Sequence, residues 1–530
     1  MTDPSPRRER RYVLAAVVLL AQAALVRVSY PRPGQFGFVA DAWGYLQLLR
    51  EDGLLVTLSR PIGYHWQPVA ILFVDLMRRV FGESAARFEA VNQLQLVSLG
   101  FLTYLLGKRV SGDAGVGLVA SLLYLGSPIY YEATYWALAG NMHLLAAQFY
   151  LVTLLLAWEV GAGRLRRSGP WLVGACALLA VLTHPAMVTV IPVAGLALVL
   201  VSRAQGETFV RGDRRLALAL LVVVGLVVVA IRVAIRLHLG PGQTPPTSFN
   251  RDGFFLIALM SAAMAQARGT LDAVFPLVAY GLGPHWPFGE RLTVGLWVWS
   301  VGPLVALAWA WRVARTAGLP VVAVFFVVHL YALGLGGALS SRQTIVMQVP
   351  VALLVAWALH ALADRLARWI DAPAATVVLR QLPVVAALVL LLRASKDHQL
   401  AARLTLQAGA TMTALRDGVA AAAPVEGPPR KLVLVNPASV LVEGGIGTQL
   451  FRNGAHSVVR LHSHPQSTLE FWHVAELPAL PYPVEAGVLT PAALRAMVAD
   501  PSYVVFVSGP PPRVLERVDA AGVEVLLAGR

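Results

Sequence analysis

One acidic residue near the start of the chain has the surroundings of a catalytic base. Asp41 stands in the segment VADAWGYLQLL, where Trp43 and Tyr45 are suited to anchor a short helix at a membrane–water interface. Partial loss of water at the mouth of a cavity raises the pKa of a carboxyl group toward the range of a general base. Because Asp is also a favoured N-cap residue, a purely structural role as a helix cap stays open.

A second group of polar residues follows in two connections between apolar segments. Arg60 precedes the segment GYHWQP, which contains His65 and Gln67. Farther on, Glu132 is the only acid between Asp113 and Glu159, and the next apolar segment opens with two polar residues, Asn141 and His143. An acid, an amide and an imidazole close together could bind a sugar or a phosphate, or they could simply meet water in a loop.

Two further sites have both a structural and a functional interpretation. Arg342, in GGALSSRQT, could bind phosphate with its planar guanidinium or extend to lipid headgroups. His184-Pro185 interrupts a long apolar run, which indicates a turn between helices first and a ligand role second.

The histidines of the C-terminal region give little support for a metal site. On a predicted strand, His462 and His464 would point to one face, as a pair of metal ligands must. Neither cysteines nor a clear carboxylate set accompany them, so we assign no metal ligands. The cofactor is left unknown, with a divalent metal possible. The sequence contains no glycine-rich phosphate loop and no common hydrolase motif.

The composition places these residues in a membrane protein. Hydrophobic residues make up 57% of the 530 residues, charged residues only 14%, and the mean hydropathy is +0.65. A soluble protein has about 25% charged residues to wet its surface, so a soluble enzyme and a disordered chain are excluded. The single cysteine, Cys176, excludes an intrachain disulfide. Residues 394–530 contain 11 basic and 11 acidic residues, so the +14 net charge lies among the apolar segments and gives no support to nucleic-acid binding.

Apolar runs of about 17–25 residues predict spanning helices. We expect about eleven, and two more apolar stretches, 64–82 and 253–282, are expected to form interfacial or partly re-entrant helices. The expected spanning segments are residues 12–28, 90–107, 114–130, 141–158, 169–183, 186–202, 216–238, 292–311, 319–337, 345–363 and 376–392.

The distribution of basic residues predicts the orientation of the chain. With the N-terminus in the cytoplasm, the cytoplasmic segments contain 17 Lys and Arg, whereas the short outer connections contain only Arg342. Residues 30–89, 239–291 and the C-terminal region then lie outside the cell membrane.

The C-terminal region predicts a small extracytoplasmic α/β domain, residues 394–530, after a transmembrane domain of residues 1–393. A helix is expected over 395–422 and another over 491–499. The expected strands are KLVLVNP, SVVRLHSHP and SYVVFVSG.

The segment from Phe88 to Trp158 resembles the core of the polytopic GT-C glycosyltransferases, most of all the O-mannosyltransferase and aminoarabinose-transferase branches. In those proteins an acid in the first outer loop precedes an Arg-Pro-Leu-like element and an interfacial helix. Here Asp41, then Arg60-Pro61-Ile62 and residues 64–82, stand in that order. A second family element is echoed by Ser127-Pro128, Glu132-Ala133 and Trp136, and a later one by Arg342 and Pro350 without the family's tyrosine.

The resemblance implies an inverting transfer of a sugar from a polyprenyl-phosphate donor to an acceptor hydroxyl at the outer membrane face. Asp41 is then the general base. The implied acceptor is a glycan, a lipid or a protein. The expected substrate-binding residues are Arg60, His65, Gln67, Glu132, Asn141, His143 and Arg342.

One departure from the family pattern weakens the expectation of metal dependence and of activity. Many relatives carry paired acids in this loop, whereas Asp41 lies between Ala40 and Ala42. A partner-binding pseudo-enzyme or membrane scaffold is therefore the alternative function. A transporter of lipid-linked sugars is a more distant one, because the sequence shows no repeated halves.

Overall fold

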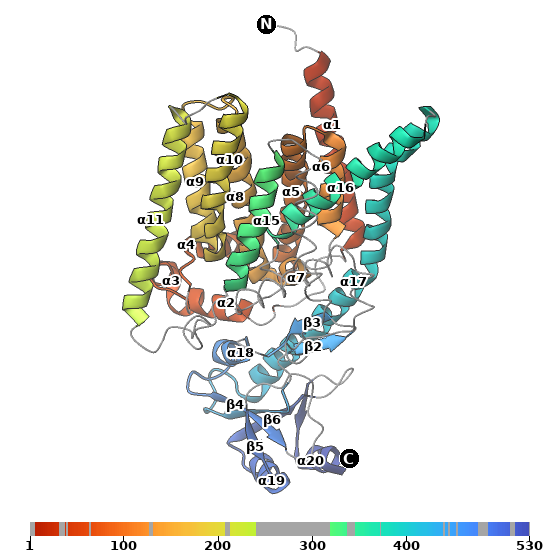
Figure 1. Cartoon of the computed structure of the whole chain (residues 1–530). Coiled ribbons are helices and arrows are strands. Elements are labelled where there is room, and N and C mark those ends of the chain that lie inside the picture. Colours follow the sequence, from red (N-terminus) through yellow and green to blue (C-terminus); the bar gives the residue numbers. More distant parts are fainter. Residues whose placement is uncertain are drawn as a thin grey trace, which may run out of the picture.

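The computed structural model places a bundle of helices beside a smaller α/β region formed by the C-terminal part of the chain (Figure 1). The residues that the structure describes are 6–30, 38, 41–62, 65–126, 131–206, 212–239, 318–335, 345–370, 373–437, 440–443, 446–451, 454–474, 486–508 and 515–528.

Helices occur at ten of the eleven segments predicted to span the membrane. The eleventh, 292–311, lies outside the described residues, as does the apolar stretch 253–282. The helices of the bundle are α1 (Pro6–Ser29), α5 (Ala85–Ser111), α6 (Ala114–Gly126), α8 (Ala137–Gly161), α9 (Gly169–Thr183), the 3₁₀ turn η2 (Pro185–Thr189), α10 (Val190–Ala204), α11 (Asp213–Leu239), α15 (Gly318–Leu335), α16 (Gln348–Trp369) and α17 (Pro373–Ala422).

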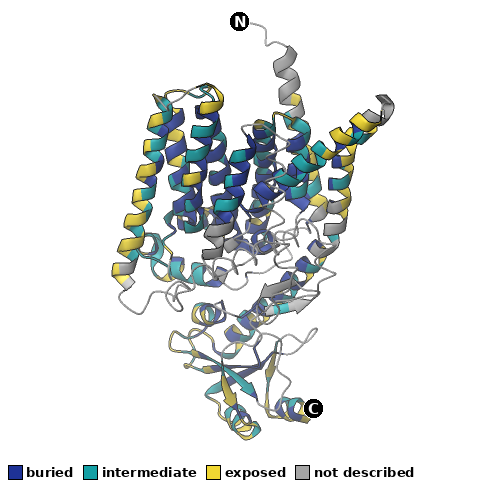
Figure 2. Ribbon diagram, in the orientation of Figure 1, coloured by how far each residue is buried: buried dark blue, intermediate teal, exposed yellow. Residues whose placement is uncertain are grey.

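Apolar side chains on the outside of the bundle indicate a lipid environment. Within the described residues, five helices are long and apolar enough to cross a membrane. Within the segment Asp213–Ile235 of α11, an 18-residue stretch has a mean hydropathy of 3.0, yet only 11% of that stretch is buried. Figure 2 shows the exposed outer face of this helix. Exposing so much apolar surface to water would be unfavourable, so the outside of the bundle faces lipid and the chain is a multi-pass membrane protein.

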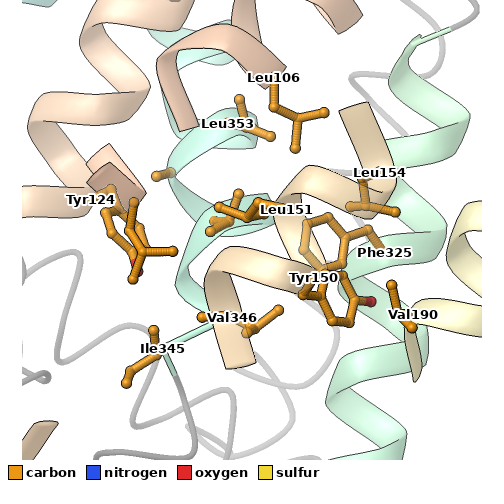
Figure 3. Packing of buried hydrophobic residues seen from close by; sticks show 14 of the residues in the cluster. Leu106, Tyr124, Tyr150, Leu151, Leu154, Val190, Phe325, Ile345, Val346 and Leu353 are labelled. Carbon is orange, nitrogen blue, oxygen red and sulfur yellow. The ribbon is translucent and has the colours of Figure 1, made fainter. Parts of the chain in front are cut away.

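The interior of the bundle is packed with aliphatic and aromatic side chains (Figure 3). Tyr150 of α8 stacks on Phe325 of α15 with 5.3 Å between ring centroids. A glycine contact brings α5 and α6 close together, because a Cβ atom on Gly107 would lie 2.8 Å from the Cα atom of Gly117. Such small-residue contacts replace the hydrophobic driving force that is absent between helices in lipid.

Short helices cross one end of the bundle. They are α2 (Asp41–Glu51), α3 (Gly53–Ser59), α4 (Pro68–Phe81) and α7 (Tyr131–Tyr135). We call this the domain end, because the C-terminal strands lie beyond it (Figure 1). The opposite end, where α5 turns into α6 and α8 turns into α9, is called the far end.

Helix α4 shows how charges are tolerated in the apolar stretch 64–82. The Asp75 side chain is 3% exposed and accepts hydrogen bonds from Arg78 Nη2 at 3.0 Å and Arg79 Nε at 2.6 Å. Burial alone would raise the pKa of Asp75, but the two guanidinium groups lower it overall. The buried charge is thus paired locally.

Helix α17 joins the two parts of the chain. It runs for 50 residues and continues without a break through residues 393 and 394, where the sequence analysis divides the chain. Its first half packs on α6 and α16, and its second half packs on the C-terminal strands and on α18 (Gly454–His462).

The C-terminal elements form a five-stranded sheet of order β5-β4-β1-β6-β7. Strand β1 pairs in parallel with β4 and β6, with Leu434 opposite Phe471 and Phe506, and β7 is antiparallel to β6. Strands β2 and β3 form a separate antiparallel hairpin. The strands are β1 (Lys431–Val435), β2 (Val440–Glu443), β3 (Ile446–Gln449), β4 (Thr468–Val474), β5 (Gly487–Leu489), β6 (Tyr503–Val507) and β7 (Glu516–Val518), and the outer helices are α19 (Pro491–Ala499) and α20 (Ala520–Ala528).

The predicted strand SVVRLHSHP is wrong, because this segment contains most of helix α18. Ala455, Val458 and Val459 are buried at helical spacing, and the two adjacent valines alone had favoured a strand. The arrangement of His462 and His464 on one strand face is therefore lost. The other two parallel strands of the sheet, β4 and β5, were not predicted.

Candidate functional site

Helix α2, which begins at Asp41, is fixed between the membrane bundle and the C-terminal elements. Trp43 Nε1 donates to the Phe38 carbonyl at 2.9 Å, and the edge of the Trp43 ring meets His462 of α18 with centroids 5.6 Å apart. At the other end of α2, Arg460 Nε of α18 bonds Glu51 Oε1 at 2.9 Å. The side chain of Asp41 lies outside the described residues, but the helix that bears it is held from both sides.

The helix α7 that contains Glu132 is tied closely to α5. Asn92 Nδ2 donates to the carbonyls of Thr134 and Trp136, at 3.3 and 3.1 Å. At Gly140 an added Cβ would lie 2.0 Å from the Ala133 carbonyl oxygen, so only glycine allows this approach. The Glu132 side chain and the whole of Arg342 lie outside the described part of the chain.

Asn141 has a structural task that the sequence did not reveal. Its side chain is fully buried, and Nδ2 donates to the carbonyls of Phe88, at 3.2 Å, and of Ala137. The bond to Phe88 joins the start of α8 to α5, and the bond to Ala137 lies within the first turn of α8. As a substrate-binding residue, Asn141 would have only its Oδ1 atom to offer in this arrangement.

Helix α5 presents a buried polar stripe toward this region. Glu89, Asn92 and Gln95 follow one another at three-residue spacing and are exposed by 1%, 0% and 6%. None of the three is among the residues predicted to bind substrate. Their signal was present nonetheless, since polar residues inside an apolar segment are costly and usually functional.

Three histidines come together at the domain end. The ring centroids of His143 and His184 are 4.3 Å apart, and those of His65 and His184 are 6.1 Å apart. His184, first interpreted as a turn residue, links the two predicted site residues. Loss of water and the positive charge of Arg232 both lower the pKa of His65, which favours its neutral ring. Among the described residues, no three His, Cys, Asp or Glu side chains are grouped to hold a metal ion.

The remaining predicted residues have different surroundings. Arg60 pairs with Asp52, so its charge is already used within the α3 segment. Gln67 is 9% exposed and precedes α4, and its carbonyl accepts from Ile71 N at 3.1 Å.

A buried aromatic contact closes this end of the bundle. Tyr30, just after α1, lies 4.4 Å from the ring of His398 of α17 and 6.0 Å from the ring of Tyr135, measured between centroids. Burial lowers the pKa of His398 to about 4, so its ring is neutral at physiological pH.

The domain end thus combines a buried glutamate, buried amides and several imidazoles beside the helices that begin with, or contain, Asp41 and Glu132. Neutral donors and acceptors of this kind suit sugar hydroxyls. A carboxylate in low-dielectric surroundings suits proton transfer.

Solved structures with a similar arrangement of helices are membrane glycosyltransferases. An oligosaccharyltransferase from Archaeoglobus fulgidus, solved with an inhibitory peptide and a dolichol-phosphate, is 14% identical, has a TM-score of 0.45, and is matched over 86% of this chain and 65% of its own length. This chain therefore spans just under two thirds of that protein.

Two other structures give a comparable match. ArnT from Cupriavidus metallidurans, bound to undecaprenyl phosphate, is 15% identical with a TM-score of 0.43 over 94% of this chain and 93% of its own. The arabinofuranosyltransferase AftD from Mycobacteria is 15% identical with a TM-score of 0.44 over 98% of this chain and 38% of its own.

The enzymes retrieved are of the GT-C kind that the sequence resembles. A likeness of this strength carries no assignment of activity. No family model matches the sequence, and no curated protein matches it.

Proposed function

We propose that this chain is a glycosyltransferase that moves a sugar from a polyprenyl-phosphate donor to an acceptor hydroxyl. The observation that carries the proposal is the gathering of buried polar side chains at one end of an otherwise apolar bundle, beside the start of α2. Glu89, Asn92 and Asn141 are each at most 1% exposed there. Polar groups buried at membrane depth are retained where they serve a substrate.

In this reaction Asp41 accepts the proton of the acceptor hydroxyl. The oxygen so activated attacks the anomeric carbon from the face opposite the phosphate, and a new glycosidic bond forms with inversion. The bond between the anomeric carbon and the phosphate oxygen breaks, and the polyprenyl phosphate leaves with the electron pair. Arg342 is the candidate cation for the charge that develops on the leaving group.

The polar residues around α5 and the histidines are proposed to hold the sugar and the acceptor. His65, His143 and His184 are suited to this because neutral imidazoles both donate and accept hydrogen bonds. The acceptor is a glycan, lipid or protein, and we place the domain end outside the cell membrane, with the N-terminus in the cytoplasm.

Sugar transfer by Asp41→Asn tests the proposal. The change keeps the shape of the side chain and removes the base, so transfer from a radiolabelled polyprenyl-phosphate sugar pool should fall by about 10²–10⁴-fold. The matched control is Asp364→Asn, which changes an exposed acid close to the C-terminus of α16. Its rate of transfer should stay within about twofold of the wild-type rate. The same assay with a chelator decides whether a divalent metal is needed.

Retained transfer in Asp41→Asn would remove the base from the mechanism. If neither the wild type nor the variant transfers sugar although both are folded, the chain is a scaffold or pseudo-enzyme instead.

A further inference from the structure

A pocket of about 360 Å³ lies at the far end of the bundle, away from the candidate active site. It is formed where α5, α8 and α10 end, together with the turn that follows α8. Among the side chains that line it are Lys108, Arg109 and Arg164, as well as Trp158 and Gln205. Three cations around one pocket are suited to an anion.

One carboxylate balances part of this charge. Glu159 forms ion pairs with both arginines, through Oε1 with Arg109 Nε at 2.8 Å and through Oε2 with Arg164 Nε at 2.5 Å. It therefore holds both guanidinium groups in place. Each arginine retains further N–H donors, because a guanidinium carries five. Within the described residues Lys108 makes no ion pair, and its ammonium group lies 5.9 Å from the Tyr104 ring centroid.

The helix ends add a smaller, opposing contribution. The carboxyl termini of three helices meet at the pocket, and each is equivalent to at most about half a negative charge. The three full positive charges exceed the sum of one carboxylate and these partial charges. The pocket therefore keeps a net positive charge. Lys108 and the outer N–H groups of Arg109 are the donors that no described carboxylate uses.

The position of the pocket favours a lipid over a soluble anion. The segments Ala85–Ser111, Gly140–Gly161 and Pro185–Ala204 are candidate membrane spans, and all three end at this pocket. It therefore lies at headgroup depth. Its wall also includes the apolar residues Trp158 and Val201, which are 9% and 3% exposed. A basic pocket between spanning helices at this depth is a typical site for an acidic lipid headgroup.

We propose that this pocket binds the phosphate of an anionic phospholipid from the leaflet at the far end. Lys108, Arg109 and Arg164 provide the positive charge, and Gln205 offers an amide donor. The proposal does not depend on the function proposed for the domain end.

Native mass spectrometry of the full chain in detergent, titrated with phosphatidylglycerol, tests the site. Lys108→Gln combined with Arg164→Gln should weaken binding about tenfold, because two charges close to the phosphate are lost. Glu159→Gln should strengthen binding a few-fold, because it frees both arginines and removes the opposing charge. A gain of this kind cannot come from misfolding.

The control is Arg215→Gln, an exposed cation of α11 that does not line the pocket, and it should bind as the wild type does. Phosphatidylcholine and inorganic phosphate are titrated in parallel, and both should bind at least tenfold more weakly than phosphatidylglycerol. Equal lipid binding by the double variant, or weaker binding by Glu159→Gln, would overturn the site. Inorganic phosphate binding as tightly as phosphatidylglycerol would overturn the lipid assignment.

Discussion

The two ends of the bundle are polar in opposite ways. At the domain end, Glu89, Asn92 and Asn141 are buried, and their polar atoms are directed into the protein. At the far end, the side chains of Arg109 and Arg164 are about half exposed and act at the surface. A buried polar group is costly unless it is paired, whereas an exposed cation costs little and interacts with lipid headgroups. This difference underlies the two proposals, sugar transfer at the domain end and the binding of a lipid headgroup at the far end.

The largest effect on this comparison is expected from removing the buried carboxyl group of Glu89 at the domain end. Glu89→Gln keeps the shape of the side chain, and we expect sugar transfer to fall by about a hundredfold if the carboxylate serves the reaction. Initial rates with the radiolabelled donor measure the effect, and thermal unfolding in detergent checks the fold. A rate within twofold of wild type would show that the polar stripe on α5 is structural.

Acid should destabilise the domain end through His398. Because burial lowers its pKa from 6.5 to about 4, its contribution to stability is complete above pH 6.5 and is lost as the pH falls toward 4. Between pH 7 and pH 5 the loss is on the order of 2 kcal/mol. Unfolding of wild type and His398→Gln over this range measures it, and the variant should show the smaller pH dependence. Parallel pH curves for the two proteins would contradict the assignment.

A smaller effect is expected from the contact between α2 and α18. Reversing either charge, in Glu51→Arg or Arg460→Glu, should lower transfer by about tenfold, because α2 loses one of the contacts that fix its position. The double variant restores an opposite pair and should recover most of the rate. If the single variants are as active as wild type, α18 does not position α2.

The smallest effect is expected at the far end. Arg215→Gln removes an exposed cation, and surface changes of this kind usually alter stability by no more than about 0.5 kcal/mol. Transfer and unfolding temperature should both match wild type. A large loss of transfer would show that the two ends are coupled.

Much of the bundle could be predicted from hydropathy, because lipid requires long apolar runs, and the predicted runs that lie within the described residues form helices. The C-terminal region was harder. Strands β1 and β6 and helix α19 follow the sequence closely, but Val458 and Val459 suggested a strand where burial has a helical period. In a segment this short, two adjacent valines outweighed the spacing of Ala455.

Several residues of the candidate site were predicted from the sequence, but their arrangement in space was not. His65 and His143 were named, and a turn was predicted at His184-Pro185, yet the sequence does not show that this turn brings His184 beside the other two rings. Glu89 was not identified as a candidate although it lies in the apolar helix α5, because a polar residue in such a helix signals a function without showing which groups it meets. Arg60, predicted to bind substrate, pairs with Asp52, a contact that the sequence alone did not indicate.

The core shared by α2 and α18 has a consequence for the order of biosynthesis. Trp43, Leu46 and Leu49 belong to the same packed cluster as Ala455, Val458 and Val459. The ribosome makes the first three residues about 400 residues before the others, so α2 must wait for its packing partner through most of translation. A chain that stops after its last membrane helix would insert in full and still lack a settled α2. Residues in the final fifth of the chain are thus needed before α2, in the first fifth, can pack in its final position.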